Sequence, residues 1–178
     1  MRIAATALEG VFTIETKAHQ DERGYFHRLY DSETFAATGI DFVTRQSGVS
    51  HNLRRGTLRG MHYQKAPASQ AKLVRCLTGS VYDVVIDLRP GSATYMRWLG
   101  FELSAENCLA LFIPSGLAHG FISLSDRTDM LYELSAGERA DCVGGVRWND
   151  AAFGIAWPIA PIVMNQRDAD WPDFKAVD

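Results

Sequence analysis

Several kinds of chemistry have little support in this chain. Its three cysteines are odd in number and far apart, and no CxxC pair exists, so neither a disulfide framework nor a zinc knuckle is indicated. Its five histidines form no HxH pair, and no acidic residue stands at a matching spacing. Because a bound metal needs several converging ligands, the sequence favours chemistry without a metal.

Motifs for nucleophilic catalysis and for phosphate loops are missing as well. The chain has no GxSxG nucleophile elbow and no glycine-rich loop that opens a helix. Nucleophilic catalysis is therefore poorly supported. Any phosphate bound by this protein has to be held by arginines such as Arg23 and Arg59.

A strong charge bias and a long apolar run are also lacking. The net charge of −3 gives no general field for nucleic acid or membranes, so we expect neither as a partner. No apolar run approaches the ~18 residues of a membrane span, and the N-terminal residues lack an apolar run long enough for a signal peptide, so we expect neither. With no cysteine pattern for disulfides, we expect a cytoplasmic protein. The length fits one domain over residues 1–178.

What the chain does contain is a series of short strand-like runs. Alternating apolar residues predict strands over 10–16, 25–30, 57–64, 71–77, 81–88, 96–103 and 108–114. Residues 115–120 are expected to form a loop, and 121–124 is expected to form a hairpin with 130–134. About eight to ten such strands predict an all-β sandwich or barrel.

Two segments differ from this strand pattern. A two-turn helix is predicted over 32–38, with Ser32 as its N-cap and Gly39 closing it. The end of the chain, from about residue 148, is aromatic and non-periodic, and we expect it to wrap around the barrel.

The stretch from Arg55 to Leu77 concentrates the polar chemistry. Its two predicted strands, interpreted as neighbours, carry Arg59, His62 and Lys72. Arg59 and His62 have opposite strand parity, so they share a face only if Gly60 marks a bulge. A polar, solvent-facing sheet surface is the alternative interpretation of the same stretch.

Proton transfer is the reaction type that these residues fit best. His62 can act as a base near neutral pH, and Lys72 can stabilise a developing oxyanion. Tyr132, in the predicted strand 130–134, can donate a proton. Both faces of the strand 81–88 are partly apolar, so Asp83 is expected to be a buried carboxylate that needs a partner.

Several blocks of the sequence together resemble one family. GTLRGMHYQ, KLVRC, DVVIDLRP and IPSGLAHGF, followed by Tyr132 and the pair Arg167-Asp168, resemble the dTDP-4-dehydrorhamnose 3,5-epimerase family over about residues 21–172. The resemblance implies a cupin-type, double-stranded antiparallel jelly roll that needs no metal and no cofactor. It also implies a homodimer in which N-terminal strands are exchanged.

The resemblance further implies a substrate and a set of site residues. The substrate would be a nucleoside-diphosphate 4-keto-6-deoxyhexose, inverted at carbon 3, carbon 5 or both. The implied catalytic residues are His62, Lys72, Tyr132 and Asp168, with Asp168 paired to His62. The implied substrate contacts are Arg23, Phe26, Gln46, Arg59 and His119, and Asp83 is implied to support the site from behind.

Three positions depart from the family pattern. Gly48 stands in place of an asparagine, Arg28 in place of a glutamate, and Glu138 in place of an aromatic residue. The nucleotide and the sugar are therefore left open. A single-carbon epimerase, a 3,4-ketoisomerase and a catalytically silent sugar-binding cupin are the alternatives. Tyr132 favours epimerisation, because inversion needs a proton donor opposite the base.

Overall fold

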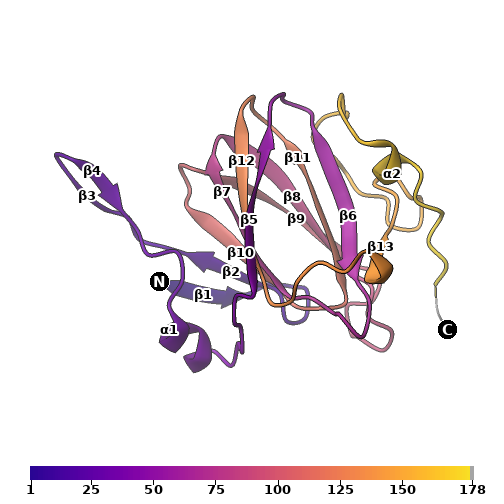
Figure 1. Ribbon diagram of the computed structural model, residues 1–178, viewed down its shortest axis with the longest axis horizontal. Helices are drawn as coiled ribbons and strands as arrows, with labels where there is room; N and C mark the ends of the chain where they lie inside the picture. Colours follow the sequence, from indigo (N-terminus) through magenta and orange to yellow (C-terminus); the bar gives the residue numbers. More distant parts are fainter. Residues whose placement is uncertain (177–178) are drawn as a thin grey trace.

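Two antiparallel sheets face each other in the computed structural model, which describes residues 1–176 (Figure 1). The first sheet has the order β1 (Arg2–Ala5), β2 (Phe12–Glu15), β10 (Leu109–Ile113), β7 (Lys72–Thr78), β12 (Thr128–Leu134), β5 (Gln46–Asn52). The second has the order β13 (Val143–Gly145), β6 (Leu58–Gln64), β11 (Leu117–Ser123), β8 (Ser80–Asp87), β9 (Trp98–Ser104). This architecture confirms the predicted all-β jelly roll.

The remaining elements are small. Strands β3 (His19–Asp21) and β4 (Gly24–Phe26) form a separate hairpin. The helices are α1 (Ser32–Ala37), the 3₁₀ turn η1 (Ala140–Cys142) and α2 (Gln166–Ala169). In the part of the chain that the structure describes, no helix has the length and apolar character that a membrane crossing requires.

The main hydrophobic core lies between the two sheets. It is built from inward-facing side chains that alternate along the strands, as the two-residue period of a strand requires. Val74 and Cys76 of β7 meet Val81 and Val85 of β8 in this layer, and Phe121 of β11 lies among them. Full burial of each such apolar side chain contributes about 1.5–3 kcal/mol, so this layer fixes the spacing of the sheets.

The outer faces of both sheets are partly covered. Helix α1 places Phe35 on the first sheet, where it packs with Phe42 and Phe112. The C-terminal segment places Phe153 and Trp157 on the second sheet, around Met61, Val84 and Ile86. The prediction that the irregular tail wraps the β structure is thereby confirmed.

The N-cap of helix α1 lies one residue earlier than predicted. Asp31, not Ser32, is the N-cap: its Oδ1 accepts a hydrogen bond from the backbone N–H of Thr34 at 2.9 Å. Its carboxylate also accepts a bond from the Thr34 hydroxyl at 2.7 Å. Gly39 follows the helix in the left-handed conformation, as predicted.

Four predicted local arrangements were wrong. β6 and β7 are not neighbours, since they belong to opposite sheets. β11 and β12 form no hairpin: β11 pairs with β6 and β8, whereas β12 pairs with β5 and β7. The predicted loop over 115–120 contains the start of β11, and the predicted strand over 25–30 ends at Phe26. The first two errors share one cause. The chain passes from one sheet to the other between β6 and β7 and again between β11 and β12, so these consecutive strands do not pair.

Candidate active site

A cleft opens between the facing sheets and contains most of the predicted residues. It consists of two adjoining hollows of about 230 Å³ each, which share His62, Lys72, Tyr132 and Arg167. The first hollow continues to residues that include Gln70, Leu134 and Glu138. The second continues to Ser50, Arg59, His119, Asn165 and Asp168. His62 comes from the second sheet, whereas Lys72 and Tyr132 come from the first.

A buried carboxylate holds the imidazole of His62. Asp168 Oδ1 lies 2.6 Å from His62 Nε2, and its other oxygen accepts the backbone N–H of Gly60 at 3.0 Å. Burial would raise the pKa of Asp168, but these hydrogen bonds outweigh it and leave that pKa below its ordinary value. The carboxylate is therefore ionised, which fixes the proton of neutral His62 on Nε2 and leaves Nδ1 as the free acceptor.

The short helix α2 presents Asp168. Asn165 is its N-cap, and the Asn165 side chain accepts the N–H of Asp168 itself at 2.7 Å. Asn165 also lines the cleft, as does Arg167. Neither residue was predicted to belong to the site, although an asparagine three positions before an aspartate is a recognisable capping signal.

A bulge in β6 puts Arg59 and His62 on the same face, as Gly60 suggested. His119 of β11 pairs with His62, and Phe121 pairs with Arg59, so β6 contains one extra residue between these pairs. Gly60 has φ +137°, and a Cβ there would lie 2.5 Å from the Cα of Gly120. Only glycine fits so close an approach of two strands.

Arg59 is oriented by β5. Its Nε donates to Asn52 Oδ1 at 2.8 Å, and its Nη2 donates to the backbone oxygen of His51 at 3.2 Å. The guanidinium borders the cleft beside Ser50, whose buried hydroxyl oxygen has no hydrogen-bond partner among the described residues. Ser50 is a third cleft residue, after Asn165 and Arg167, that was not predicted from the sequence.

Lys72 reaches across the cleft from the first sheet. Its Nζ donates to the backbone oxygen of His62 at 3.0 Å, which bridges the two sheets at the site. Burial lowers the pKa of Lys72 to about 8, although the carboxylate of Asp83 opposes that shift. The ammonium keeps two further N–H groups for a ligand.

A second imidazole–carboxylate pair lies on the second sheet, facing Lys72 and Tyr132 of the first. His119 Nε2 is 2.8 Å from Asp83 Oδ2, and both side chains are buried, so the predicted buried carboxylate has its partner. Burial lowers the pKa of His119, which favours its neutral form. The ring centroid of His119 is 5.8 Å from that of Tyr132, and burial raises the pKa of the Tyr132 phenol.

Three predicted substrate contacts lie outside this cleft in the isolated chain. Gln46 is at the rim, where its side chain accepts the N–H of Glu138 at 3.0 Å. Arg23 and Phe26 belong to the hairpin β3–β4, and Phe26 is 69% exposed. Figure 1 shows this hairpin projecting from the sheets on the side away from β6 and α2.

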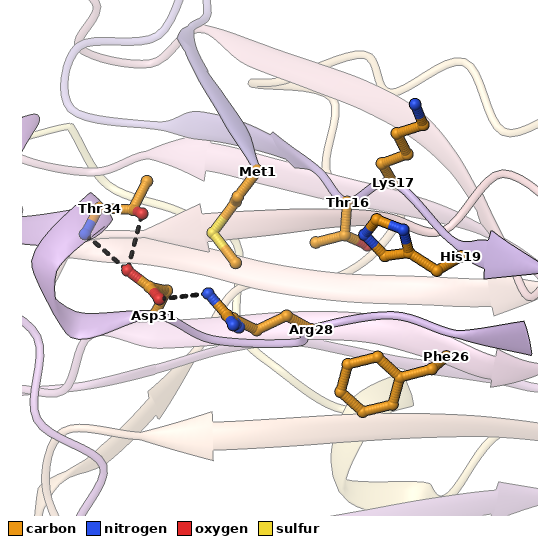
Figure 2. Close-up of a pocket in the computed structure, with 8 residues that line it drawn as sticks. All are labelled: Met1, Thr16, Lys17, His19, Phe26, Arg28, Asp31 and Thr34. Atoms are coloured by element: carbon orange, nitrogen blue, oxygen red, sulfur yellow. Dashed lines mark hydrogen bonds and ion pairs between the residues drawn. The ribbon is translucent and has the colours of Figure 1, made fainter.

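Another hollow lies beside the hairpin but lacks an acid–base pair of this kind. Figure 2 shows it lined by Lys17, His19 and Phe26, among others, with Arg28 paired to Asp31. It contains none of the four predicted catalytic residues. Among residues 1–176, no three His, Cys, Asp or Glu side chains are grouped so that they could hold a metal ion.

Comparison with known proteins places this cleft in a family. The family model described as dTDP-4-dehydrorhamnose 3,5-epimerase matches residues 5–176. The curated dTDP-4-dehydrorhamnose 3,5-epimerase of Salmonella typhimurium is 38% identical over 173 residues, which are 97% of this chain and 94% of that protein.

Solved structures agree with this assignment. The dTDP-4-dehydrorhamnose 3,5-epimerase from Bacillus anthracis, solved with TDP and PPi bound, aligns with a TM-score of 0.94 at 34% identity and covers 97% of this chain and 99% of its own. ChmJ, a 3′-monoepimerase from Streptomyces bikiniensis in complex with dTDP-quinovose, aligns with a TM-score of 0.88 at 37% identity, over 94% and 85% of the two chains. The chain therefore belongs to the dTDP-4-dehydrorhamnose 3,5-epimerase family and is an isomerase of the sugar-epimerase class.

Proposed function

We propose that the cleft inverts carbon 3, carbon 5 or both in a nucleoside-diphosphate 4-keto-6-deoxyhexose. The observation that carries this proposal is the position of His62 and Tyr132, which border one cleft from facing sheets. Inversion at a carbon requires a base on one face of the sugar and a proton donor on the other. A sugar ring between the two sheets would meet one group on each face.

His62 is the base in this proposal. The 4-keto group acidifies the protons on carbons 3 and 5, and Nδ1 of His62 carries the free lone pair that accepts one of them. The buried, ionised Asp168 then stabilises the imidazolium that forms, 2.6 Å away. Proton transfer by such a positioned side chain contributes roughly 100- to 10,000-fold to the rate.

Lys72 stabilises the enolate, and Tyr132 completes the inversion. Removal of a ring proton places negative charge on the 4-keto oxygen, and the buried ammonium of Lys72 offers its free N–H groups to that oxygen. Burial keeps the Tyr132 phenol protonated, so it is ready to donate from the opposite face. The pair of His119 and Asp83 belongs to the opposite wall, on the sheet of His62, and presents a neutral imidazole to the ligand.

The diphosphate is assigned to the hollow that contains Arg59 and Arg167. Guanidinium groups bind phosphate through parallel charged hydrogen bonds, and Arg59 is already oriented by Asn52. The side of the cleft toward Glu138 carries a carboxylate, which repels phosphate. We place the sugar between these two parts, beside His62.

The experiment that tests this function uses a panel of nucleotide 4-keto-6-deoxysugars in deuterated water. Proton NMR reports which ring positions gain deuterium and which epimer accumulates. Deuterium at carbon 3 alone identifies a single-carbon epimerase, and deuterium at both carbons identifies a 3,5-epimerase. A 3,4-ketoisomerase would yield a 3-keto sugar. A protein that binds the sugars and exchanges nothing would contradict the proposed function and support a binding role.

The pH dependence of the catalytic activity is expected to follow the protonation of Lys72. The ammonium form stabilises the enolate, so kcat/KM should fall as the pH rises through about 8, the pKa of Lys72. Burial raises the pKa of the Tyr132 phenol, so the phenol loses its proton at a higher pH than Lys72 does. A Lys72→Arg variant keeps its charge and should lose this alkaline fall, although its overall rate is lower. A wild-type profile that stays flat to pH 10 would contradict the role of Lys72.

Activity is expected to survive exhaustive chelation. The 4-keto group is its own electron sink, and the cleft supplies its charge stabilisation through Lys72 and two arginines. The measurement compares initial rates before and after dialysis against a chelator, with metal content verified by elemental analysis. Loss of activity that one added divalent ion restores would overturn this expectation.

The protein is proposed to act as a homodimer of single-domain chains in the cytoplasm. Hairpin β3–β4 carries exposed Tyr25 and Phe26, and the outer face of the first sheet exposes Val49. Arg75 and Glu133 on that face each keep buried polar atoms without a hydrogen-bond partner among the described residues. A second copy would cover these groups, and free cysteines fit a reducing compartment.

Light scattering at micromolar concentration is expected to show a dimer. Arg23, on the projecting hairpin, would then serve the cleft of the partner and add a diphosphate contact to those of Arg59 and Arg167 there. Mixing an Arg23→Ala chain with a chain that carries His62→Ala should restore part of the activity, because one of the two clefts is then intact. A strictly monomeric and fully active protein would contradict the exchange.

A further inference from the structure

Gly145 occupies the position beside His62 at the edge of the second sheet. The two residues are direct partners in the ladder between β13 and β6. Side chains of paired residues on antiparallel strands lie on the same face and contact each other. A side chain at position 145 would therefore lie against the imidazole of His62, but glycine leaves that place open.

The indole of Trp171 fills this place. A Cβ on Gly145 would lie 2.1 Å from Trp171 Cε2 and 2.4 Å from its Nε1, well inside any real contact distance. The backbone of Gly145 is not in the left-handed region, so its conformation does not require glycine. The indole is what excludes a larger residue there.

Trp171 also contacts the proposed base directly. The ring centroids of Trp171 and His62 are 6.5 Å apart, with the planes inclined by 67°, which is an edge-to-face contact. The indole N–H is buried and has no hydrogen-bond partner among the described residues. A buried N–H without a partner is unfavourable, so the benefit of this residue lies in its ring.

The same segment of chain supplies the carboxylate and this ring. Asp168 binds Nε2 of His62 from α2, and Trp171 follows three residues later. On its other side, His62 has His119 of β11 as its ladder partner. The imidazole is therefore bounded by a carboxylate at one nitrogen, by His119 on one flank and by an indole on the other.

We infer that Trp171 is a positioning residue for epimerisation, which keeps the His62 imidazole aligned with Asp168 and its free nitrogen directed into the cleft. The inference rests on the proposed role of His62 as the base. A single hydrogen bond at Nε2 leaves the imidazole free to swing about its side-chain bonds. The packed indole removes that freedom on the flank where Gly145 offers no side chain.

The first test compares Trp171→Ala with Trp171→Phe. A misplaced catalytic group costs on the order of 100-fold, so Trp171→Ala should lower kcat by about that factor and change KM by less than about threefold. Trp171→Phe should recover most of the loss, because it keeps a flat ring and gives up an N–H that binds nothing. Each variant is assayed well below its measured unfolding midpoint. A raised KM with an unchanged kcat would overturn the inference.

The second test uses Gly145→Ala. Its methyl group must displace the indole, so this variant should lose kcat about as Trp171→Ala does. In a double variant, Gly145→Ala should add no further loss to Trp171→Ala, because no indole remains to be displaced. Losses that multiply in the double variant would show that the two positions act separately, contrary to the inference.

Two controls separate this inference from the proposed function. Trp157, a tryptophan of the same C-terminal segment, packs on Tyr82 and donates to the Trp148 backbone oxygen, away from His62. Trp157→Ala should lower the unfolding midpoint and leave kcat within about threefold, as expected for a change without misalignment of the base. His62→Ala is measured in parallel. An active His62→Ala variant would show that His62 is not the base. An inactive His62→Ala variant together with a Trp171→Ala variant of wild-type kcat would show that only the positioning role of Trp171 fails.

Discussion

Replacing His62 with alanine is expected to abolish both epimerisation and the incorporation of solvent deuterium into the sugar. Without the imidazole the proposed base is absent, so the enolate is not expected to form. The loss should reach at least the roughly 100- to 10,000-fold that a general base contributes. Proton NMR in deuterated water measures exchange and inversion in the same sample.

The chain offers a matched control for this substitution. His51 forms a similar pair, with its Nδ1 2.6 Å from Asp129 Oδ1, but its side chain is more exposed and does not line the cleft. His51→Ala should leave exchange and epimerisation near the wild-type rates. Rapid deuterium exchange by His62→Ala would remove His62 from the mechanism.

Tyr132→Phe is expected to separate exchange from inversion. His62 can still remove a proton and return a deuteron to the same face, so label enters the sugar while the inverted product hardly forms. Among the described residues no hydrogen bond to the Tyr132 hydroxyl is found, so its removal should leave the shape of the cleft intact. The ratio of deuterium incorporation to epimer formation is the quantity to measure, and it should rise by about 100-fold or more.

A second tyrosine gives the control for this result. Tyr82 on β8 packs against Trp157 on the outer side of the second sheet. Tyr82→Phe removes a hydroxyl from a partly buried phenol without touching the cleft, and the ratio should stay at its wild-type value. Epimerisation by Tyr132→Phe near the wild-type rate would show that another group returns the proton.

Some features of the site depend only on residues that are close together in the sequence, and these could be predicted from local sequence signals. The parity of Arg59 and His62 required a bulge at Gly60, and the register between β6 and β11 contains it. The apolar pattern around Asp83 required a partner for a buried carboxylate, and His119 supplies one. Both features follow from strand periodicity and from the cost of burying charge.

Features that depend on the path of the chain between sheets were not predictable in this way. The alternation within β6 and β7 fits a strand in either sheet, so it could not show that His62 and Lys72 lie on opposite walls. The pair of His62 and Asp168 joins residues 106 positions apart, and the family resemblance alone suggested it. Asp31 and Ser32 are both good caps, so sequence could not choose between them.

Because His62, the proposed base, and Tyr132, the proposed proton donor, stand on different sheets, hydrophobic packing sets the gap between them. Val74 of β7 and Val85 of β8 pack in the layer that separates the walls of the cleft, although neither lines it. Interiors are packed at nearly crystalline density, so one methylene more or less in this layer changes the separation of the sheets. If His62 and Tyr132 act as proposed, that separation decides which ring carbon both groups can reach. Core side chains that do not line the cleft would then influence the stereochemistry of the product.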